Sequence, residues 1–249
     1  MRTTSQRIFM MLLLSLAGSG RHDASAQTSA ATIRRADVAK SKGESAWVKQ
    51  MSDQQGVVTN SRFDVIFIGD SLTEFWTSLG KASWPERFAP LKCANCGITG
   101  DRTEHILYRM ATLDFRRSAP RAFVLLMGTN NLGMENPDKP EEVARAILNG
   151  MAMLIKRHPQ SKIIILGIPP SGVAPQTPLR ESIKQTNAIL TKASLPAQAL
   201  FMPTYEIFAD EADRWRDGLT LDGTHFSAAG YAKLAEMLAP KLKELLGTK

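Results

Sequence analysis

The sequence predicts a single three-layer α/β domain in which helices cover both faces of a five-stranded parallel sheet. Five short runs are largely apolar instead of alternating regularly with polar residues, which is typical of strands buried on both faces. Segments with the helical spacing of apolar residues lie between these runs. No internal repeat and no linker is found after Asn60. Because strand–helix–strand connections are right-handed, these elements predict a doubly wound domain.

The predicted elements follow one another in strand–helix alternation. The expected strands are the apolar runs at residues 63–68, 91–96, 122–127, 162–168 and 199–202. The expected helices lie at 103–111, 141–157, 179–193 and 228–246, with an earlier one near 37–51. Pro240 predicts a kink in the last helix, because proline removes a helical hydrogen bond.

The first 26 residues have the pattern of an export signal. Residues 1–7 carry two arginines and no acidic residue, and residues 8–17 form an apolar run of about ten, half the roughly 20 that span a bilayer. Ala24-Ser25-Ala26 then supplies the small-x-small pattern of a cleavage site. We expect a signal peptide at 1–26, cleavage near Ala26 and export to the periplasm or the medium. An N-terminal extension at 27–60 and the main domain at 61–249 would follow.

Composition argues against two classes of protein. The formal net charge is +7, and the 28 basic and 23 acidic residues after position 26 leave a net +5 that is spread thinly. This charge is too dilute to indicate a nucleic-acid-binding protein. No segment after residue 26 reaches 18 uncharged apolar residues, so stable membrane insertion is not expected.

Two cysteines cannot form a disulfide framework. Cys93 and Cys96 lie three residues apart in a predicted strand, where their side chains point to opposite faces. A disulfide needs α-carbons within about 7 Å, whereas this spacing puts them about 10 Å apart. We expect both to be reduced, buried packing residues.

Polar residues and glycines follow three successive predicted strands. Residues 69–71 read Gly-Asp-Ser, residues 97–101 read Gly-Ile-Thr-Gly-Asp, and residues 128–131 read Gly-Thr-Asn-Asn. A fourth group, Asp-Gly-Thr-His at 222–225, precedes the last helix. Ligands bind at the carboxyl ends of parallel strands, so these four groups predict one site.

Ser71 is the candidate nucleophile. With Glu74 it also forms the sequence pattern of a capping box, in which Ser71 would be the N-cap. The two roles are compatible, because a serine that opens a helix points its hydroxyl into the strand-end cleft. A serine hydroxyl is a weak nucleophile near neutral pH and needs a neighbouring base.

His225 is the best candidate base. Asp222, three residues earlier in a glycine-containing turn, can bend back to fix the imidazole tautomer and stabilise the imidazolium. A turn Asp beside a histidine that precedes a helix is the alternative for this pair alone. His105 and His158 fall in or at the end of predicted helices, where we expect surface positions. No second histidine and no cysteine is clustered with His225, so no metal or other cofactor is expected.

Three groups are candidate oxyanion donors: the backbone amides of Ser71 and Gly100 and the side chain of Asn130. A glycine after a strand lets its amide approach a ligand closely, and an asparagine side chain offers two N–H groups. Taken singly, Gly100 and Asn130 also fit ordinary turn positions. Their joint placement at strand ends favours a binding role.

These residues resemble a known family. Gly69-Asp70-Ser71-Leu72, Gly100, Gly128-Thr129-Asn130 and Asp222-x-x-His225 match, in order, the four blocks of the GDSL-type SGNH hydrolase superfamily of serine esterases. The resemblance covers residues 63–246 and is tightest at 95–109, which is similar to catalytic subunits of platelet-activating-factor acetylhydrolase.

The resemblance implies a flavodoxin-like sheet and assigns roles to the candidate residues. Ser71 would be the nucleophile, His225 the base and Asp222 its partner. The oxyanion hole would consist of Ser71, Gly100 and Asn130.

The chain departs from that branch in two ways. Thr99 stands where a glycine is expected beside Gly100, which would narrow the cleft floor. An export signal is foreign to the cytosolic animal enzymes, and exported bacterial members more often remove acetyl or other short acyl groups from glycans or small esters. We therefore expect a metal-independent serine esterase that forms an acyl-enzyme with a small-molecule or glycan ester.

Other functions remain open. The chain could be a lysophospholipase or thioesterase, or a non-catalytic carbohydrate-binding module on a hydrolase scaffold. Trp76, Trp84 and Trp215 could form a sugar platform, although core packing is the alternative for at least two of them. The sequence contains no Gly-x-Ser-x-Gly elbow and no Gly-x-Gly-x-x-Gly after a strand, which argues against α/β-hydrolase and dinucleotide-binding folds.

Overall fold

A computed structural model describes residues 36–88 and 91–248. The signal peptide predicted at 1–26 and its cleavage site near Ala26 therefore lie outside the described residues. From residue 36 onward, the described chain belongs to one compact unit. Within it, no described helix is both long enough and apolar enough to cross a membrane.

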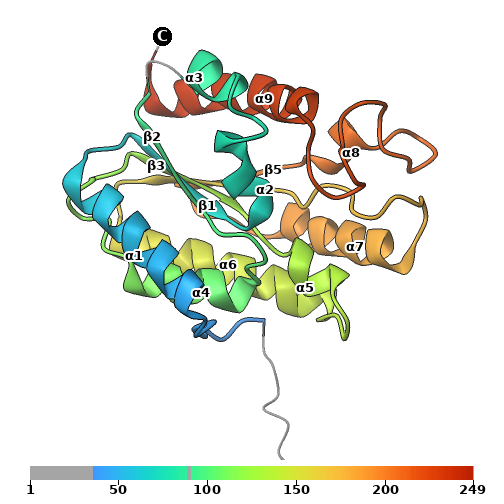
Figure 1. The fold of residues 1–249 in the computed structure, drawn as a ribbon, viewed down its shortest axis with the longest axis horizontal. Helices are drawn as coiled ribbons and strands as arrows, with labels where there is room; N and C mark the ends of the chain where they lie inside the picture. The colour runs from blue at the N-terminus through green and yellow to red at the C-terminus, as the bar shows by residue number, and fades with distance from the viewer. Residues whose placement is uncertain (1–35, 89–90, 249) are drawn as a thin grey trace, which may run out of the picture. The chain divides into compact units, whose positions relative to one another are not determined.

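The sheet has five parallel strands in the order β2-β1-β3-β4-β5 (Figure 1). This confirms the predicted doubly wound α/β class. The strands are β1 Val65–Gly69, β2 Cys93–Gly97, β3 Ala122–Leu126, β4 Lys162–Leu166 and β5 Ala199–Met202. Each lies within two residues of its predicted start and end, and β5 matches its prediction at both ends.

The helices alternate with the strands along the chain. The longer ones are α1 Ser45–Asn60, α4 Thr103–Thr112, α6 Pro140–Arg157, α7 Pro178–Lys192 and α9 Ala228–Leu246. The shorter ones are α2 Ser71–Glu74, α3 Ser83–Phe88, α5 Thr129–Gly133, α8 Tyr205–Phe208 and a 3₁₀ turn, η1, at Phe75–Thr77. Helix α9 has the predicted bounds and continues through Pro240.

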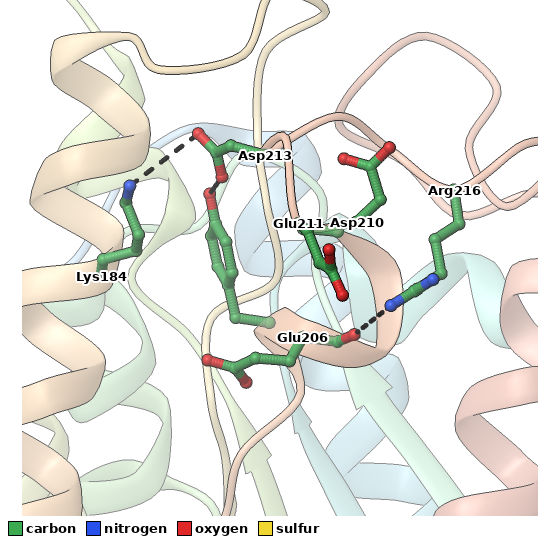
Figure 2. A pocket seen from close by; sticks show the side chains of 8 residues that line it. Lys184, Glu206, Asp210, Glu211, Asp213 and Arg216 are labelled. Carbon is green, nitrogen blue, oxygen red and sulfur yellow. Dashed lines mark hydrogen bonds and ion pairs between the residues drawn. The ribbon is translucent and has the colours of Figure 1, made fainter.

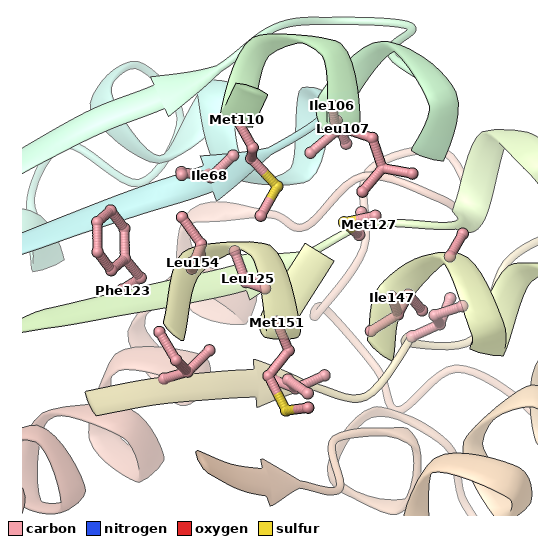
Figure 3. Close-up of a cluster of buried hydrophobic side chains, with 14 of the residues drawn as sticks. Ile68, Ile106, Leu107, Met110, Phe123, Leu125, Met127, Ile147, Met151 and Leu154 are labelled. Carbon is pink, nitrogen blue, oxygen red and sulfur yellow. The ribbon is translucent and has the colours of Figure 1, made fainter. Parts of the chain in front are cut away.

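Strands β1 and β3 are apolar throughout because each contributes to two cores. In β1, Ile66 and Ile68 belong to the core under α1, α4, α6 and α7, whereas Val65 and Phe67 belong to the core under α3 and α9. Figure 3 shows part of the first core, where Met110 from α4 and Leu154 from α6 gather over the sheet. Burial on both faces removes the alternation that a one-sided sheet would show.

The helix predicted near residues 37–51 is displaced. The observed helix α1 begins at Ser45 and ends at Asn60. Gly43 has a φ of 78°, a left-handed conformation that interrupts right-handed helical geometry just before the N-cap residue Glu44.

Helix α1 is part of the domain rather than an appended extension. Val58 is fully buried in the first core, and the Gln55 side chain accepts a hydrogen bond from the Asp114 amide at 2.8 Å. Helix α1 therefore packs within the same compact unit as the residues from 61 onward.

Candidate active site

The three strand-end loops predicted to form a site are neighbours in space. Strand β1 lies between β2 and β3, and Gly69 at its end pairs in register with Gly97 of β2 and Leu126 of β3. The loops that carry Ser71, Gly100 and Asn130 therefore leave the same edge of the sheet side by side. Sheet order alone brings these groups together.

Ser71 opens helix α2, but Asp70 is its N-cap. The Asp70 Oδ1 atom accepts from the Leu72 amide at 2.9 Å. The capping box expected from Ser71 and Glu74 is therefore wrong by one residue, because the Asp70 carboxylate occupies the capping position. This leaves the Ser71 hydroxyl free for another partner.

That partner is His225. Its Nε2 atom lies 3.0 Å from the Ser71 Oγ atom, and its Nδ1 atom lies 2.7 Å from the Asp222 Oδ2 atom. The other Asp222 oxygen, Oδ1, accepts from the backbone amides of Thr224 at 2.9 Å and His225 at 2.8 Å. The structure thus aligns hydroxyl, imidazole and carboxylate in the order that the sequence predicted.

The Asp222 carboxyl is stabilised in its ionised form. Burial would raise its pKa, but hydrogen bonds from the His225 ring and from the amides of His225 and Thr224 outweigh this and lower the pKa. An ionised carboxylate on Nδ1 keeps the proton on that nitrogen and leaves Nε2 as the acceptor facing Ser71.

The loop that carries His225 is fixed from several sides. Trp215 donates its indole N–H to the Gly223 carbonyl at 2.9 Å, and the Ser171 and Thr224 hydroxyls lie 2.9 Å apart. The Phe75 ring lies 5.2 Å from the His225 ring, measured between centroids. Gly223 has a φ of 86°, a left-handed conformation that favours glycine.

The three tryptophans do not form a shared platform. Trp76 is buried and packs against Trp84 in the core with Phe67 and Phe88. Trp215 is half-buried and packs on Phe208 and Phe226 at another part of the same core. These contacts account for core packing by two of the three, as the sequence alternative expected.

The Asn130 side chain is hydrogen-bonded to the residue that follows Gly100 in the chain. Gly100 has a φ of 72°, and the next residue, Asp101, accepts a hydrogen bond on its carbonyl oxygen from the Asn130 side-chain Nδ2 at 2.8 Å. Asn130 is in the first turn of α5, whose N-cap is Gly128 with a φ of 118°. A Cβ at Gly128 would come within 2.8 Å of the Ile168 and Val143 side chains, so only glycine fits there.

Thr99, the departure from the family pattern, is bound to α2. Its amide and its hydroxyl both donate to the Glu74 Oε2 atom. The Glu74 carboxylate therefore reaches across to the loop that follows β2 instead of back to the helix N-terminus.

Asp70 is a buried carboxyl that sequence analysis passed over as a functional residue. It is fully buried, and its Oδ2 atom has no hydrogen-bond partner among the described residues. Burial raises its pKa to about 7, helped by the nearby Asp101 charge and opposed by the Leu72 amide and by His225. A titratable group is thus present directly beside the nucleophile.

A buried ion pair lies beneath the loops and was also missed. The Arg109 Nε atom donates to the Asp101 Oδ2 atom at 2.7 Å, and both residues are completely buried. The sequence held a signal for this pair: Arg109 shares the apolar face of α4 with Ile106 and Met110, where a charged residue needs a buried partner.

The other two histidines within the described residues, His105 and His158, are not surface residues. His105 is half-buried and its Nδ1 atom accepts from the Arg102 amide at 3.1 Å. His158 is half-buried against Phe115 and Phe123. The surface positions expected for both are therefore wrong, because the ends of α4 and α6 face packed neighbours.

Both cysteines are free, and they lie on opposite faces of β2. Cys96 is buried in the core under α4 and α6, whereas Cys93 is half-buried against the other core. Burial raises the pKa of each thiol to about 12. The expectation of two reduced packing residues is confirmed, with Cys93 less buried than expected.

A pocket of about 310 Å³ lies away from these residues, between α7 and α8 (Figure 2). Asp213 lines it, where it accepts from the Tyr205 hydroxyl at 2.6 Å and lies 3.9 Å from the Lys184 ammonium. Asp213 also accepts from the Gln176 amide at 2.8 Å. These bonds tie the segment after β4 to α7 and α8.

In the parts of the chain that the structure covers, no group of three or more His, Cys, Asp or Glu side chains is arranged to hold a metal ion.

Comparisons with known proteins find relatives along most of the chain. The model of the GDSL-like lipase/acylhydrolase family matches residues 67–233. The rat (Rattus norvegicus) platelet-activating factor acetylhydrolase IB subunit alpha2 is 33% identical over 208 residues, which cover 82% of this chain and 86% of the relative.

Solved structures share the fold. A GDSL-like lipase from Bacteroides thetaiotaomicron is 18% identical with a TM-score of 0.64, over 79% of this chain and 97% of that one. An acetylxylan esterase from Geobacillus stearothermophilus, solved as a catalytic mutant, is 19% identical with a TM-score of 0.54, over 76% of this chain and 96% of that one.

Proposed function

Because the chain belongs to the GDSL-like lipase/acylhydrolase family and is a carboxylic ester hydrolase, we propose that it is a serine esterase for short-chain acyl esters. One observation carries this proposal: the Ser71 hydroxyl, the His225 imidazole and the Asp222 carboxylate are linked by contacts of 3.0 and 2.7 Å. Such a chain of groups activates an otherwise weak hydroxyl nucleophile.

The first half of the reaction forms an acyl-enzyme. The Ser71 oxygen attacks the ester carbonyl carbon while His225 Nε2 takes the hydroxyl proton. The tetrahedral intermediate then collapses: the bond to the alcohol oxygen breaks, and the imidazolium returns its proton to that oxygen. The alcohol leaves, and the acyl group remains on Ser71.

The second half releases the acid. Water gives a proton to His225 Nε2 and attacks the acyl carbon, and the bond to the Ser71 oxygen breaks as that oxygen is reprotonated. Asp222 stays ionised throughout and stabilises the transient imidazolium.

The negative charge of each tetrahedral intermediate needs fixed donors. The candidate donors are the amides of Ser71 and Gly100 and the side chain of Asn130. They lie in loops that follow neighbouring strands at the same edge of the sheet. Their role as an oxyanion hole is part of the proposal, and it explains why Gly100 and Gly128 hold left-handed backbone conformations beside the nucleophile.

We propose acetyl esters, on carbohydrates or small alcohols, as the substrates. The export signal predicted at residues 1–26 would place the enzyme where acetylated glycans occur. The acetylxylan esterase from Geobacillus stearothermophilus supports the idea through its fold alone. N-terminal sequencing of protein recovered outside the cytoplasm tests export and expects a start near Gln27; recovery only as intact chain from the cytoplasm would refute it.

The decisive experiment measures hydrolysis of p-nitrophenyl esters with acyl chains of two to twelve carbons. We expect the highest kcat/KM at two to four carbons, and loss of nearly all activity in Ser71→Ala. Ser182→Ala, which removes a half-buried hydroxyl that donates to the Pro178 carbonyl within α7, is the matched control and should keep full activity. Substantial activity in Ser71→Ala would refute the mechanism.

The chain-length profile separates the substrate classes. A maximum at eight carbons or beyond would refute the short-chain proposal and favour a lipid or thioester substrate. Glycan binding without turnover at any chain length, persisting in Ser71→Ala, would favour a binding module instead.

A further inference from the structure

We propose that helix α1 positions the oxyanion donors, through Trp47, Gln50 and Gln54. This inference rests on the proposed function and assigns a catalytic consequence to a helix outside the residues matched by the family model. The segment held by these side chains is residues 97–101, which we call the β2 loop. Trp47 and Gln54 contact this loop directly, whereas Gln50 reaches it through Glu74 of α2.

Trp47 holds the end of the β2 loop. It is 3% exposed, and its indole N–H donates to the Asp101 Oδ1 atom at 2.7 Å. Its ring packs on His105 and Tyr108 of α4, with centroid distances of 6.4 and 5.9 Å. The other Asp101 oxygen is bound by Arg109, so Trp47 supplies half of the bonds that satisfy a fully buried carboxylate.

Gln54 holds the start of the loop. Its Nε2 atom donates to the Gly97 carbonyl at 2.9 Å, and its Oε1 atom accepts from Arg109 at 3.3 Å. The same guanidinium donates to the Gly69 carbonyl at 2.8 Å and the Cys96 carbonyl at 2.6 Å. Gln54 therefore contacts the Arg109 guanidinium, and this one group binds backbone carbonyls at the ends of both β1 and β2.

Gln50 acts on the middle of the loop through α2. Its Nε2 atom donates to the Glu74 Oε1 atom at 2.8 Å. The second Glu74 oxygen accepts from the amide and hydroxyl of Thr99. One glutamate thus connects α1 to the residue that precedes Gly100.

The contacts of α1 affect two candidate oxyanion donors, the Gly100 amide and the Asn130 side chain. Gly100 lies between Thr99 and Asp101, and both of these neighbours are held by the contacts of α1. The Asp101 carbonyl in turn accepts from Asn130. The Gly100 amide and the Asn130 side chain therefore depend on the position of the same short loop.

Donors of this kind act on charge that develops during the reaction, so their misplacement raises the barrier more than it weakens substrate binding. A displacement of about 1 Å at a reacting group can lower a rate about 100-fold. We expect loss of the α1 contacts to lower kcat and to leave KM nearly unchanged.

The test compares Trp47→Phe and Gln54→Met with Val58→Ala in the full chain. Trp47→Phe keeps an aromatic ring but removes the N–H donor, and Gln54→Met keeps length but removes the amide. Val58→Ala destabilises the same helix without touching the β2 loop. Activity is measured with p-nitrophenyl acetate, and the melting temperature of each variant is recorded.

We expect kcat to fall roughly 10- to 100-fold in Trp47→Phe and in Gln54→Met, with KM within about twofold of the parent. Val58→Ala should lower the melting temperature and keep the parental kcat. Equal kcat values in the parent, Trp47→Phe and Gln54→Met would overturn the inference, as would a matching loss in Val58→Ala. If Trp47→Phe does not fold, Gln54→Met decides.

The result is separable from the proposed function. If Ser71→Ala loses activity while the α1 variants keep it, only the positioning role fails. If Ser71→Ala retains activity, the serine mechanism itself fails, whatever the α1 variants show.

Discussion

The Asn130 side chain donates one N–H to the carbonyl oxygen of Asp101, at 2.8 Å. A side-chain amide has two N–H groups, so one remains for a ligand. The bond to Asp101 removes rotational freedom from the amide before a substrate arrives. Asn130 is thus pre-oriented by the neighbouring loop rather than by its own helix.

Replacing Asn130 with alanine should lower kcat by roughly 100- to 1,000-fold, the usual effect of losing one oxyanion donor. The measurement is turnover of p-nitrophenyl acetate, with circular dichroism to verify the fold. Asn149→Ala, at an exposed position on α6, is the matched control and should be neutral. An unchanged kcat in Asn130→Ala would remove this residue from the oxyanion hole.

Asp222→Asn should lower kcat by about two to four orders of magnitude. The carbonyl oxygen of the introduced asparagine can still accept from the Thr224 and His225 amides, but its NH₂ group would face His225 Nδ1 and favour the wrong imidazole tautomer. Steady-state kinetics checks this, with exposed Asp217→Asn as the control. Parental turnover in Asp222→Asn would show that the carboxylate is dispensable.

Asp70 should make stability depend on pH. Its carboxyl has an ordinary pKa of 3.8 when unfolded, and burial raises the pKa to about 7 in the folded protein. Between these values the folded protein keeps a proton that the unfolded chain has released. The Asp70 contribution to the free energy of unfolding is therefore greatest below about pH 4, falls as the pH rises towards 7, and is level above that.

Asp70→Asn tests this dependence. Asparagine can still accept from the Leu72 amide through its carbonyl oxygen, and it cannot ionise. Urea unfolding at pH 5 and pH 8 should show the variant gaining stability relative to the parent at the higher pH. A difference between variant and parent that is the same at both pH values would contradict the raised pKa.

The two thiols should be unreactive in the folded protein and reactive after unfolding. Burial raises both pKa values to about 12, which leaves little thiolate at neutral pH. Mass spectrometry after iodoacetamide treatment, without reductant, should show two added groups on the unfolded chain and none on the native protein. Absence of both groups on the unfolded chain would indicate a disulfide.

The sheet and the strand-end groups could be predicted because they depend on local patterns. Uniformly apolar runs such as 122–127 indicate strands buried on both faces, and parallel topology then places their carboxyl ends at one edge. This reasoning locates Ser71 from the sequence alone. His225 is instead indicated by its spacing from Asp222 in a turn before the last helix, and neither argument gives the 3.0 Å between the two side chains.

The supporting contacts could not be predicted in the same way. Trp47 and Asp101 are 54 residues apart, and nothing in the local sequence around either one identifies the other. The sequence misplaces the start of α1 because Gly43 interrupts an otherwise helical pattern. It also misassigns the N-cap of α2, because aspartate and serine both suit that position and only the folded turn shows which one caps.

The parallel sheet also determines when a newly made chain can become active. None of its strand pairs is a hairpin, so every pairing needs an intervening crossover, and such non-local topologies fold slowly. Ser71 precedes His225 by 154 residues. During synthesis all five strands therefore emerge from the ribosome before His225 does, so the proposed base can meet Ser71 only after the sheet segments have been made.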